Sequence, residues 1–330
     1  MLRMNNRIAL GSNLGKSIGN GTTSRYMSDL DGVADYYTIP TVSLTADFEI
    51  EFNFSGSSTN GIAFNDATTD NYIQLLTDTS LKIVYDITGV GAAFTFTTSS
   101  YQDGKLHTFK LKRVGSTTEL FLDNVSQGST TSIGTVNIPI TQIGRYDSGS
   151  FYVGGVISEV KIIDGTDLIR YYKIDEDLSA TSTIIDSGSD GSNGTAVSIT
   201  SSELFTLEGA DWIGSELVVN GDFSTDTVWT KGGSLTISGG YANFLADNDS
   251  LRQLNILLDG LTYKGTFDIV RTAGSLIACY NGTSGGLTVT STGSFTNIFN
   301  GDSGLDLWFY GTTFRGTTTN VSVKRILQAP

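Results

Sequence analysis

An alternation of apolar and polar side chains with a period of two residues is the feature that most restricts how this chain can fold. It is clearest at residues 47–54, where four apolar residues alternate with four polar ones: Phe48, Ile50, Phe52 and Phe54 against Asp47, Glu49, Glu51 and Asn53. Successive side chains of a β-strand point to opposite faces. The pattern therefore predicts a strand with one face on a core and the other in solvent.

Comparable segments follow throughout the chain, separated by short turns rich in glycine. In the first half they are residues 72–77, 81–87, 106–114, 118–122, 151–153 and 157–163. In the second half they are 216–219, 235–238, 241–245, 262–270, 275–280, 287–290, 305–310 and 321–326. Strands spaced by about 8–12 residues are typical of β-sandwiches, and no segment needs to be helical. We therefore predict an all-β protein of two tandem antiparallel β-sandwiches (jelly rolls).

The length of the chain supports this division, because 330 residues are enough for about two domains of ordinary size. The predicted parts are an extended, polar N-terminal arm at 1–24, a first sandwich at 25–200, a linker at 201–214 and a second sandwich at 215–330. The Ser/Gly-rich run at 186–194 has the composition of a linker. Apolar residues near it, such as Tyr172 and Ile184, indicate instead that part of it returns to the first sandwich.

The composition excludes several classes of function. The chain has one Cys and one His, too few for an intramolecular disulfide, a cysteine zinc cluster or a metal site with two imidazoles. A net charge of −14 would repel nucleic acid over most of the surface. Since no apolar stretch could span a bilayer or form a signal-peptide core, we predict no membrane insertion and no general secretion. Release within an assembled particle would be another way out of a cell.

Several motifs in the first half occur in the order expected for a known family. They are LDGVADY at 30–36, DGKLHTF at 103–109, ELFLDN at 119–124, YVGGVISEVKI at 152–162 and DSGSDGSNGT at 186–195. Together they resemble the laminin-G-like, concanavalin-A-type jelly roll across roughly residues 27–200. The resemblance implies a lectin-like sandwich that includes the 186–194 run.

The second half resembles the jelly-roll carbohydrate-binding modules that accompany glycan-degrading enzymes. The residues that carry this resemblance are LVVNGDFS at 217–224, VWT at 228–230, ISGGYA at 237–242, LTYKGTFD at 261–268 and TNVSVKR at 319–325. Asn320 stands where that family usually has an acidic residue, which argues against the calcium site often found there. Two such sandwiches behind a short polar arm are similar to virion proteins of tailed bacteriophages.

Glu49 and Glu51 are the strongest candidates for a catalytic pair, because they alternate along one strand face about 7 Å apart. That separation would suit an inverting glycosidase. The acidic pattern of concanavalin-type glycosidases needs further acids, however, and Phe52, Asn53 and Phe54 follow here. We therefore interpret the two glutamates as a solvated face and predict that the protein is not an enzyme.

The lone His107 and Cys279 are predicted to be structural. His107 alternates with Phe109 and Leu111 and so lies on the core side of its strand, where we expect it to be packed and hydrogen-bonded. Cys279 shares a face with Ile277 in an apolar strand, as a small buried residue does.

Aromatic residues are the better candidates for binding, because the CH faces of sugars pack on flat rings while nearby polar groups meet the hydroxyls. Asp306, Trp308 and Tyr310 share one face of their predicted strand, opposite Leu305, Leu307 and Phe309. The alternative is that both faces are covered, or that Trp308 belongs to the core. In the first sandwich, three tyrosines near turns are further candidates: Tyr72, Tyr101 and Tyr146. Trp229 follows the core tryptophan of the resembled modules and is expected to be structural.

Aspartates in glycine-rich turns are weak candidates for a structural calcium site, since carboxylate oxygens are ligands for hard cations. The candidates are Asp31, Asp186 and Asp222, with Asp29, Asp35 and Asp190 near the first two. The alternative is that they form Asx turns. No other cofactor is expected.

Together these features predict a non-enzymatic structural protein of a phage virion, as a capsid decoration, head fibre or tail-associated adhesin. Residues 1–24 would attach it to other virion proteins, and the sandwiches would contact host-surface glycans weakly and multivalently. We expect a homo-oligomer, a trimer, assembled in the host cytoplasm. The alternatives are a bacterial glycan-binding or glycan-hydrolysing protein and a purely architectural protein without a ligand.

Overall fold

The computed structural model describes residues 26–44, 47–56, 61–66, 71–87, 90–135, 138–146, 151–208, 211–258, 260–280, 286–301 and 305–327. The predicted arm at 1–24 lies outside these residues. Every regular element in the described residues is a strand except η1 (Ser201–Glu203), a single 3-10 turn. The prediction of an all-β protein is confirmed. None of the helical segments described has the length and apolar character that a bilayer-spanning helix requires.

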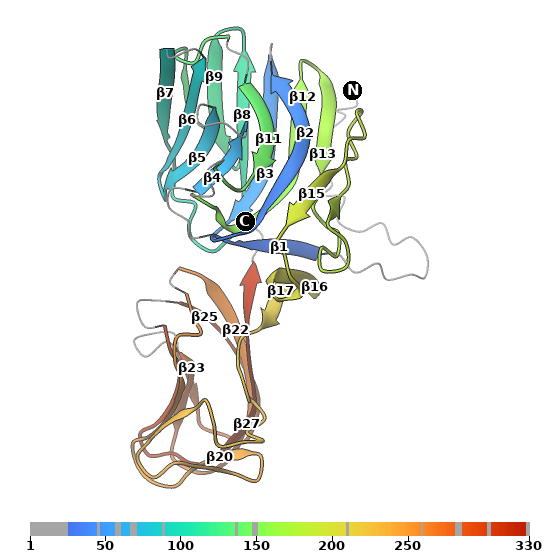
Figure 1. The fold of residues 1–330 in the computed structure, drawn as a ribbon. Coiled ribbons are helices and arrows are strands. Elements are labelled where there is room, and N and C mark those ends of the chain that lie inside the picture. The colour runs from blue at the N-terminus through green and yellow to red at the C-terminus, as the bar shows by residue number, and fades with distance from the viewer. Residues whose placement is uncertain are drawn as a thin grey trace, which may run out of the picture.

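The first sandwich consists of two antiparallel layers (Figure 1). One layer contains, in spatial order, β10 (Val125–Thr130), β9 (Thr117–Leu122), β8 (His107–Val114), β3 (Phe48–Ser55), β12 (Gly154–Asp164) and β1 (Tyr26–Asp31), with β13 (Asp167–Tyr172) also paired to β12. The other contains β14 (Thr183–Ile184), β15 (Gly194–Val197), β2 (Tyr36–Leu44), β11 (Ile138–Ile143), β4 (Gly61–Asn65), β5 (Tyr72–Thr77), β6 (Ser80–Ile87) and β7 (Val90–Thr97). Because β13 to β15 belong to these layers, the 186–194 run is part of the first sandwich.

The apolar faces of these two layers meet in one core. Along β3 the alternation predicted at 47–54 is confirmed, since Phe48, Ile50, Phe52 and Phe54 are all at most 2% exposed. The Phe52 ring stacks on Phe109 of β8 at 5.2 Å between centroids and meets an edge of Phe64 of β4 at 5.0 Å. Aromatic pairs at these separations add to the stabilisation that burial of their area provides.

The second sandwich has a different pair of layers around a core of its own. One layer contains β19 (Thr236–Ser238), β20 (Tyr241–Phe244), β27 (Arg315–Leu327), β22 (Thr262–Ala273) and β25 (Gly293–Asn300). The other is a five-stranded sheet in the order β18 (Thr230–Gly232), β21 (Asp249–Gln253), β26 (Leu307–Gly311), β23 (Leu276–Tyr280) and β24 (Leu287–Val289). Phe267 of β22 packs between Phe295 and Phe309, which joins the two layers.

A hairpin of β16 (Leu204–Glu208) and β17 (Asp211–Glu216) joins the two sandwiches through hydrogen bonds (Figure 1). β16 pairs with β1 of the first sandwich, and β17 pairs with β27 of the second. The segment predicted as a linker at 201–214 therefore connects the sandwiches as a folded part of a continuous sheet. A small apolar cluster packs beside it: Met27, Val156, Phe205 and Leu327, with Leu106 and Trp212 against them.

Two predicted strands are wrong. Residues 151–153 precede β12 as irregular chain, where Phe151 has a positive φ of 54° that a strand residue does not adopt. Residues 217–219 follow the end of β17, where Val219 donates its backbone N–H to the side chain of Gln253 instead of to a neighbouring strand. In both places apolar residues hold a loop against the core. The alternation of apolar and polar residues does not by itself distinguish them from strand residues.

Candidate functional site

The outer face of the five-stranded sheet carries the predicted aromatic residues Trp308 and Tyr310. Along β26, Leu307 and Phe309 are completely buried in the second core, whereas Trp308 and Tyr310 are half-buried on the opposite face. The alternation predicted this orientation correctly, and the alternative that Trp308 belongs to the core is wrong. Leu305 is 37% exposed and precedes the strand, so it does not share the buried face with Leu307 and Phe309 as predicted.

Arg252 of β21 lies beside Trp308, because the register of β21 and β26 pairs these two residues. Its guanidinium carbon is 5.0 Å from the centre of the indole ring, a cation–π contact. The same guanidinium lies 3.8 Å from a carboxylate oxygen of Asp306. The arginine thus holds the ring and the acid in one arrangement, a contact that sequence reasoning missed because β21 was not predicted.

Hydrogen bonds fix the remaining polar groups of this face. Tyr310 donates its hydroxyl hydrogen to Oδ1 of Asn248 at 2.8 Å. Asp306 accepts the backbone N–H of Asn255 at 3.0 Å. A half-exposed indole ring flanked by a guanidinium, a carboxylate and a phenol can pack against the CH face of a sugar and hydrogen-bond its hydroxyls. We call Arg252, Asp306, Trp308 and Tyr310 the Trp308 face.

The tyrosines predicted in the first sandwich separate into two groups. Tyr72 and Tyr146 meet edge to face at 5.5 Å, and Tyr146 also meets Phe151, which is 54% exposed. The structure therefore brings two predicted residues together at the rim of the sandwich and adds a third. Tyr101 is wrong as a contact residue, because it is completely buried and its hydroxyl donates to the carbonyl of Thr77.

Buried amide side chains near this rim were not predicted. Asn65 and Asn71 are at most 7% exposed, and Asn71 donates to the carboxylate of Asp66 at 2.5 Å. Within the described part of the chain, neither polar atom of the Asn65 side chain nor the carbonyl oxygen of Asn71 has a hydrogen-bond partner. Burial of unpaired amides is unusual in proteins. No sequence pattern shows it, since isolated asparagines in turns are common.

The calcium candidate Asp186 is fully occupied by its own loop. Its side-chain oxygens accept three backbone N–H groups at 2.8 to 2.9 Å, those of Tyr171, Gly188 and Ser192. The buried Arg170 lies 3.8 Å from the same carboxylate and also pairs with Asp190. These contacts use the oxygens that a cation would need. The Asx-turn alternative therefore describes Asp186 better than the calcium prediction does.

The candidate Asp31 also accepts local hydrogen bonds, but it lies in an acidic cluster. Its Oδ1 accepts the backbone N–H groups of Val33 and Ala34 at 2.7 and 2.8 Å, as in an Asx turn. Carboxylate oxygens of Asp31, Asp35 and Glu203 lie within 4.8 Å of one another. Burial of Asp35, together with repulsion by Glu203 and Asp31, raises its pKa to about 6. Oxygen ligands for a hard cation are thus gathered here, and calcium remains a prediction.

The third candidate, Asp222, is exposed and accepts the backbone N–H of Ser224. Nearby, Trp229 packs on Phe223 and donates its indole N–H to the carbonyl of Asn220, which confirms its predicted structural role. Asn320 donates to a carboxylate oxygen of Asp268 at 2.7 Å, a hydrogen bond between side chains of β27 and β22.

The lone histidine is buried and held between two carboxylates, as its core-side position predicted. Nδ1 of His107 lies 2.7 Å from Asp123, and Nε2 lies 2.8 Å from Asp103. Burial alone would lower the pKa of His107, but the hydrogen bonds that its ring donates to the carboxylates of Asp123 and Asp103 raise it above its usual value. The side chain of Cys279 lies outside the described residues.

Glu49 and Glu51 lie on the outer face of β3 among lysines. Glu51 is in register with Lys110 of β8 and Lys161 of β12, and it accepts a hydrogen bond from Nζ of Lys161 at 2.6 Å. Glu49 is in register with Lys112 of β8. These contacts agree with the interpretation of a solvated, charge-paired face.

Residues 54–171 match the family model of the Laminin G domain. The matched segment is about a third of the chain and lies within the first sandwich. Together with the two facing antiparallel layers, it supports a lectin-like jelly-roll fold. No curated protein sequence matches the chain.

The solved structures that are similar to the chain include the following three proteins. A Bacteroides ovatus protein described as a carbohydrate-binding candidate shares 13% identity and a TM-score of 0.43, over 56% of this chain and 61% of its own. Domains LG4-5 of the mouse laminin alpha1 chain share 11% identity and a TM-score of 0.37, over 97% and 94%. A heptameric pentraxin of Limulus polyphemus shares 9% identity and a TM-score of 0.32, over 42% and 75%. This chain thus spans less than two thirds of the length of the Bacteroides ovatus protein.

Proposed function

We propose that this protein is a non-enzymatic component of a bacteriophage virion that binds host-surface glycans through the Trp308 face. The observation that carries glycan binding is the outward, half-exposed Trp308 ring, fixed by Arg252 and flanked by Asp306 and Tyr310. A ring held in place loses little conformational freedom when a sugar packs on it. The lectin-like fold of the first sandwich is consistent with this function.

A glycan array followed by calorimetry on the best glycan tests the Trp308 face. Replacing Trp308 by Ala removes the stacking surface, so affinity should fall by about tenfold or more. The matched control is Tyr241→Ala, which removes a 43% exposed ring of β20 on the other layer and should leave affinity unchanged. A blank array, or equal losses for both variants, would favour an architectural protein without a ligand.

The pairing of Glu51 with Lys161 supports the non-enzymatic part of the proposal, because this hydrogen bond engages Oε1 of the carboxylate, as in a charge-paired surface residue. Incubation with a panel of polysaccharides should release no reducing ends. Turnover that Glu51→Gln or Glu49→Gln abolishes would establish the alternative, a bacterial glycan-hydrolysing protein.

The virion part of the proposal derives from the resemblance of the tandem sandwiches to virion proteins of tailed bacteriophages. Residues 1–24 would attach the protein to the particle, and a homo-oligomer, a trimer, would raise weak glycan affinity through avidity. Proteomics of purified particles from the source and mass photometry of the full chain test this. A strict monomer that is absent from particles would contradict it.

A further inference from the structure

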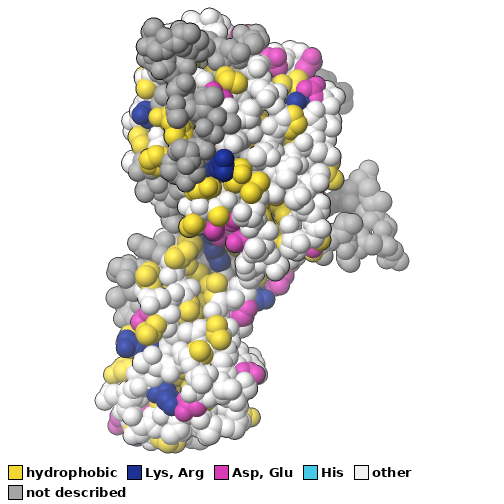
Figure 2. Space-filling model, viewed as in Figure 1, with side chains coloured by type: hydrophobic (Ala, Val, Ile, Leu, Met, Phe, Trp, Pro, Cys, Tyr) yellow, Lys and Arg dark blue, Asp and Glu magenta, His cyan; other side chains and the backbone are white. Residues whose placement is uncertain are grey.

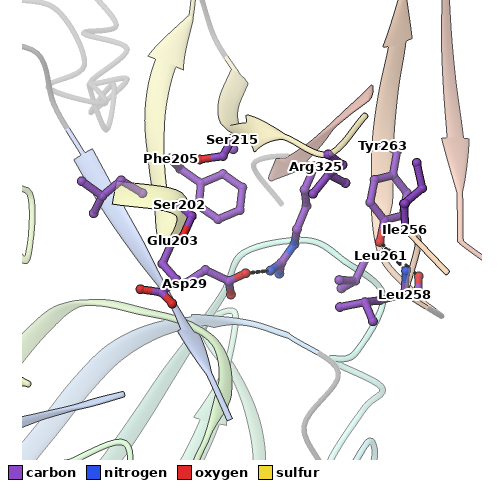
Figure 3. A pocket seen from close by; sticks show the side chains of 13 residues that line it. Asp29, Ser202, Glu203, Phe205, Ser215, Ile256, Leu258, Leu261, Tyr263 and Arg325 are labelled. Carbon is purple, nitrogen blue, oxygen red and sulfur yellow. Dashed lines mark hydrogen bonds and ion pairs between the residues drawn. The ribbon is translucent and has the colours of Figure 1, made fainter. Parts of the chain in front are cut away.

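The junction between the two sandwiches contains two partly open cavities beside an ion pair. Arg325 of β27 reaches across the junction and donates from Nη1 to Oδ2 of Asp29 on β1 (Figure 3). A cavity of about 110 Å³ lies beside this pair. A second cavity, of about 180 Å³, is also lined by Asp29 and Arg325, together with Leu258 and Leu261. Figure 2 shows a hollow with charged and apolar side chains at this waist of the molecule.

The ion pair leaves one donor and one acceptor unused. Arg325 is only 8% exposed, yet its Nη2 has no hydrogen-bond acceptor among the residues that the structure describes. Oδ1 of Asp29 is likewise buried and has no donor within the same residues. Nearly all buried polar atoms in proteins have a partner. The Asp29–Arg325 pair is therefore half-satisfied. Both atoms are closed to solvent with the side chains as they stand, so a ligand that supplies the missing hydrogen bonds has to draw Asp29 and Arg325 toward the cavity.

The first cavity, of about 110 Å³, is lined mainly by apolar side chains. The ring of Phe205 lies 5.3 Å from the guanidinium carbon of Arg325. Leu258, Leu261 and Tyr263 lie on the other side of the ion pair (Figure 3). The hydroxyl of Tyr263 already accepts the backbone N–H of Leu258 at 2.7 Å, which leaves mainly its ring for the cavity. Leu258 is 59% exposed, so it forms a lip at the surface.

The charges around the cavity select against an anion. Asp29 and Arg325 offset each other, and Glu203 also lines the cavity. Oxygens of Asp31 and Asp35 lie within 4.8 Å of those of Glu203, so the surroundings are acidic. A fitting ligand is therefore neutral, offers one donor next to one acceptor, and has apolar CH faces. The vicinal diol of a sugar has all three properties.

We propose that this junction is a second binding site, for a neutral monosaccharide unit. One hydroxyl of a vicinal diol donates to Oδ1 of Asp29, the neighbouring hydroxyl accepts from Nη2 of Arg325, and the CH face packs against Leu258 and Leu261. The site is separate from the Trp308 face, which lies on the five-stranded sheet, and it does not depend on sugar binding there.

Calorimetry and ligand-observed NMR on the full chain with glucose, galactose, mannose and fucose test the proposal. We expect millimolar binding of at least one of these sugars, and weaker binding of glucuronate. Leu258→Trp fills the exposed lip without touching the buried pair and should weaken binding at least tenfold. Asp29→Asn replaces the acceptor at Oδ1 by an amide and should also weaken it.

The matched control is Leu254→Trp, a change at a 46% exposed position of the same loop that does not line the cavity. This variant should bind as the wild type does. In a Trp308→Ala background, which removes the Trp308 face, the sugar should still bind and Leu258→Trp should still weaken that binding. The proposal is overturned if none of the four sugars binds, which would leave water as the occupant, or if Leu258→Trp has no effect. Loss of binding in Trp308→Ala would also overturn it, because the sugar would then occupy the Trp308 face.

Discussion

The loop of Asp186 and the junction at Asp29 both hold an aspartate against a buried arginine, but they satisfy it differently. The oxygens of Asp186 accept three backbone N–H groups in addition to facing Arg170. Asp29 meets Arg325 through one oxygen, and its other oxygen is unpaired. Both oxygens of the Asp186 carboxylate accept hydrogen bonds that hold the fold together. One oxygen of the Asp29 carboxylate accepts none from the residues that the structure describes.

The difference follows from where the partners lie in the chain. The donors to Asp186 are at most 15 residues away, so one loop conformation can place them all. Asp29 and Arg325 are 296 residues apart and meet only when the sandwiches dock. A contact between two separately folded cores has fewer ways to adjust, and part of its hydrogen-bonding capacity is left open.

The largest effect is expected at the saturated site. Asp186→Ala leaves three backbone N–H groups without their acceptor and removes one of the two carboxylates that face the buried Arg170, so the free energy of unfolding should fall by about 3 kcal/mol. Urea unfolding followed by circular dichroism measures this. The exposed Asp222→Ala, which removes a single hydrogen bond, should change it by less than about 0.5 kcal/mol. Equal losses of unfolding free energy in the two variants would contradict the expectation that the fully hydrogen-bonded Asp186 contributes more to stability than the exposed Asp222.

A gain in stability is expected from Asp35→Asn near the junction. The pKa of Asp35 is raised to about 6, above the ordinary value of 3.8, so the folded state binds more protons between these two pH values. Its stabilising protonated form is therefore lost as the pH rises from about 4 to 6. At pH 7 the neutral amide that the substitution introduces is not repelled by Glu203 and Asp31, but its NH₂ group lacks a hydrogen-bond acceptor. We expect a gain of about 2 kcal/mol at pH 7 that vanishes near pH 4.

Urea unfolding of wild type and Asp35→Asn at pH 4, 5, 6 and 7 checks this prediction. A variant with the same pH profile as the wild type would show that Asp35 does not titrate in this window.

A smaller loss is expected from Arg325→Met at the junction. Arg325 is buried but the side chain of Asp29 is 27% exposed, so breaking the ion pair should cost about 1.5 kcal/mol, less than for a fully enclosed pair. Adding Asp29→Asn should recover part of the loss, because the remaining charge is then removed as well. A double-mutant cycle of unfolding free energies measures this coupling. Strictly additive losses would mean that the two side chains do not interact.

The smallest effect is expected at His107 and should depend on pH. Its pKa is raised above the ordinary 6.5 by Asp103 and Asp123, so its stabilisation is complete below pH 6.5. It is lost as the pH rises through the higher folded value. His107→Gln should cost about 1 kcal/mol at pH 6 and less at pH 9. Thermal unfolding at both pH values measures the difference, and a constant cost would show that the imidazole stays neutral.

Much of the fold could be predicted because alternation is a local property. The pattern at 47–54 identified β3 and its buried face, and the pattern at 305–310 placed Trp308 outward. Which strands pair with each other was harder to predict from the sequence. The alternation of apolar and polar residues is weak in four strands: β1, β16, β17 and β21. Arg252 is the clearest example, because it belongs to the Trp308 face only through the register of β21 with β26. The prediction of Tyr101 as a contact residue was wrong for a related reason. Its hydroxyl lies inside the core, where it donates to a carbonyl that only the tertiary packing brings near.

By itself, the sequence determined the all-β class, the two cores and the outward orientation of Trp308. Those features depend on the period of two residues and on burial of apolar area, which neighbouring residues encode. Only the tertiary structure decided that residues 204–216 join both sandwiches into one sheet, that Asp186 is saturated and that Asp29 is not. Hydrogen bonds and ion pairs between distant residues depend on how whole layers dock, and no local pattern records that.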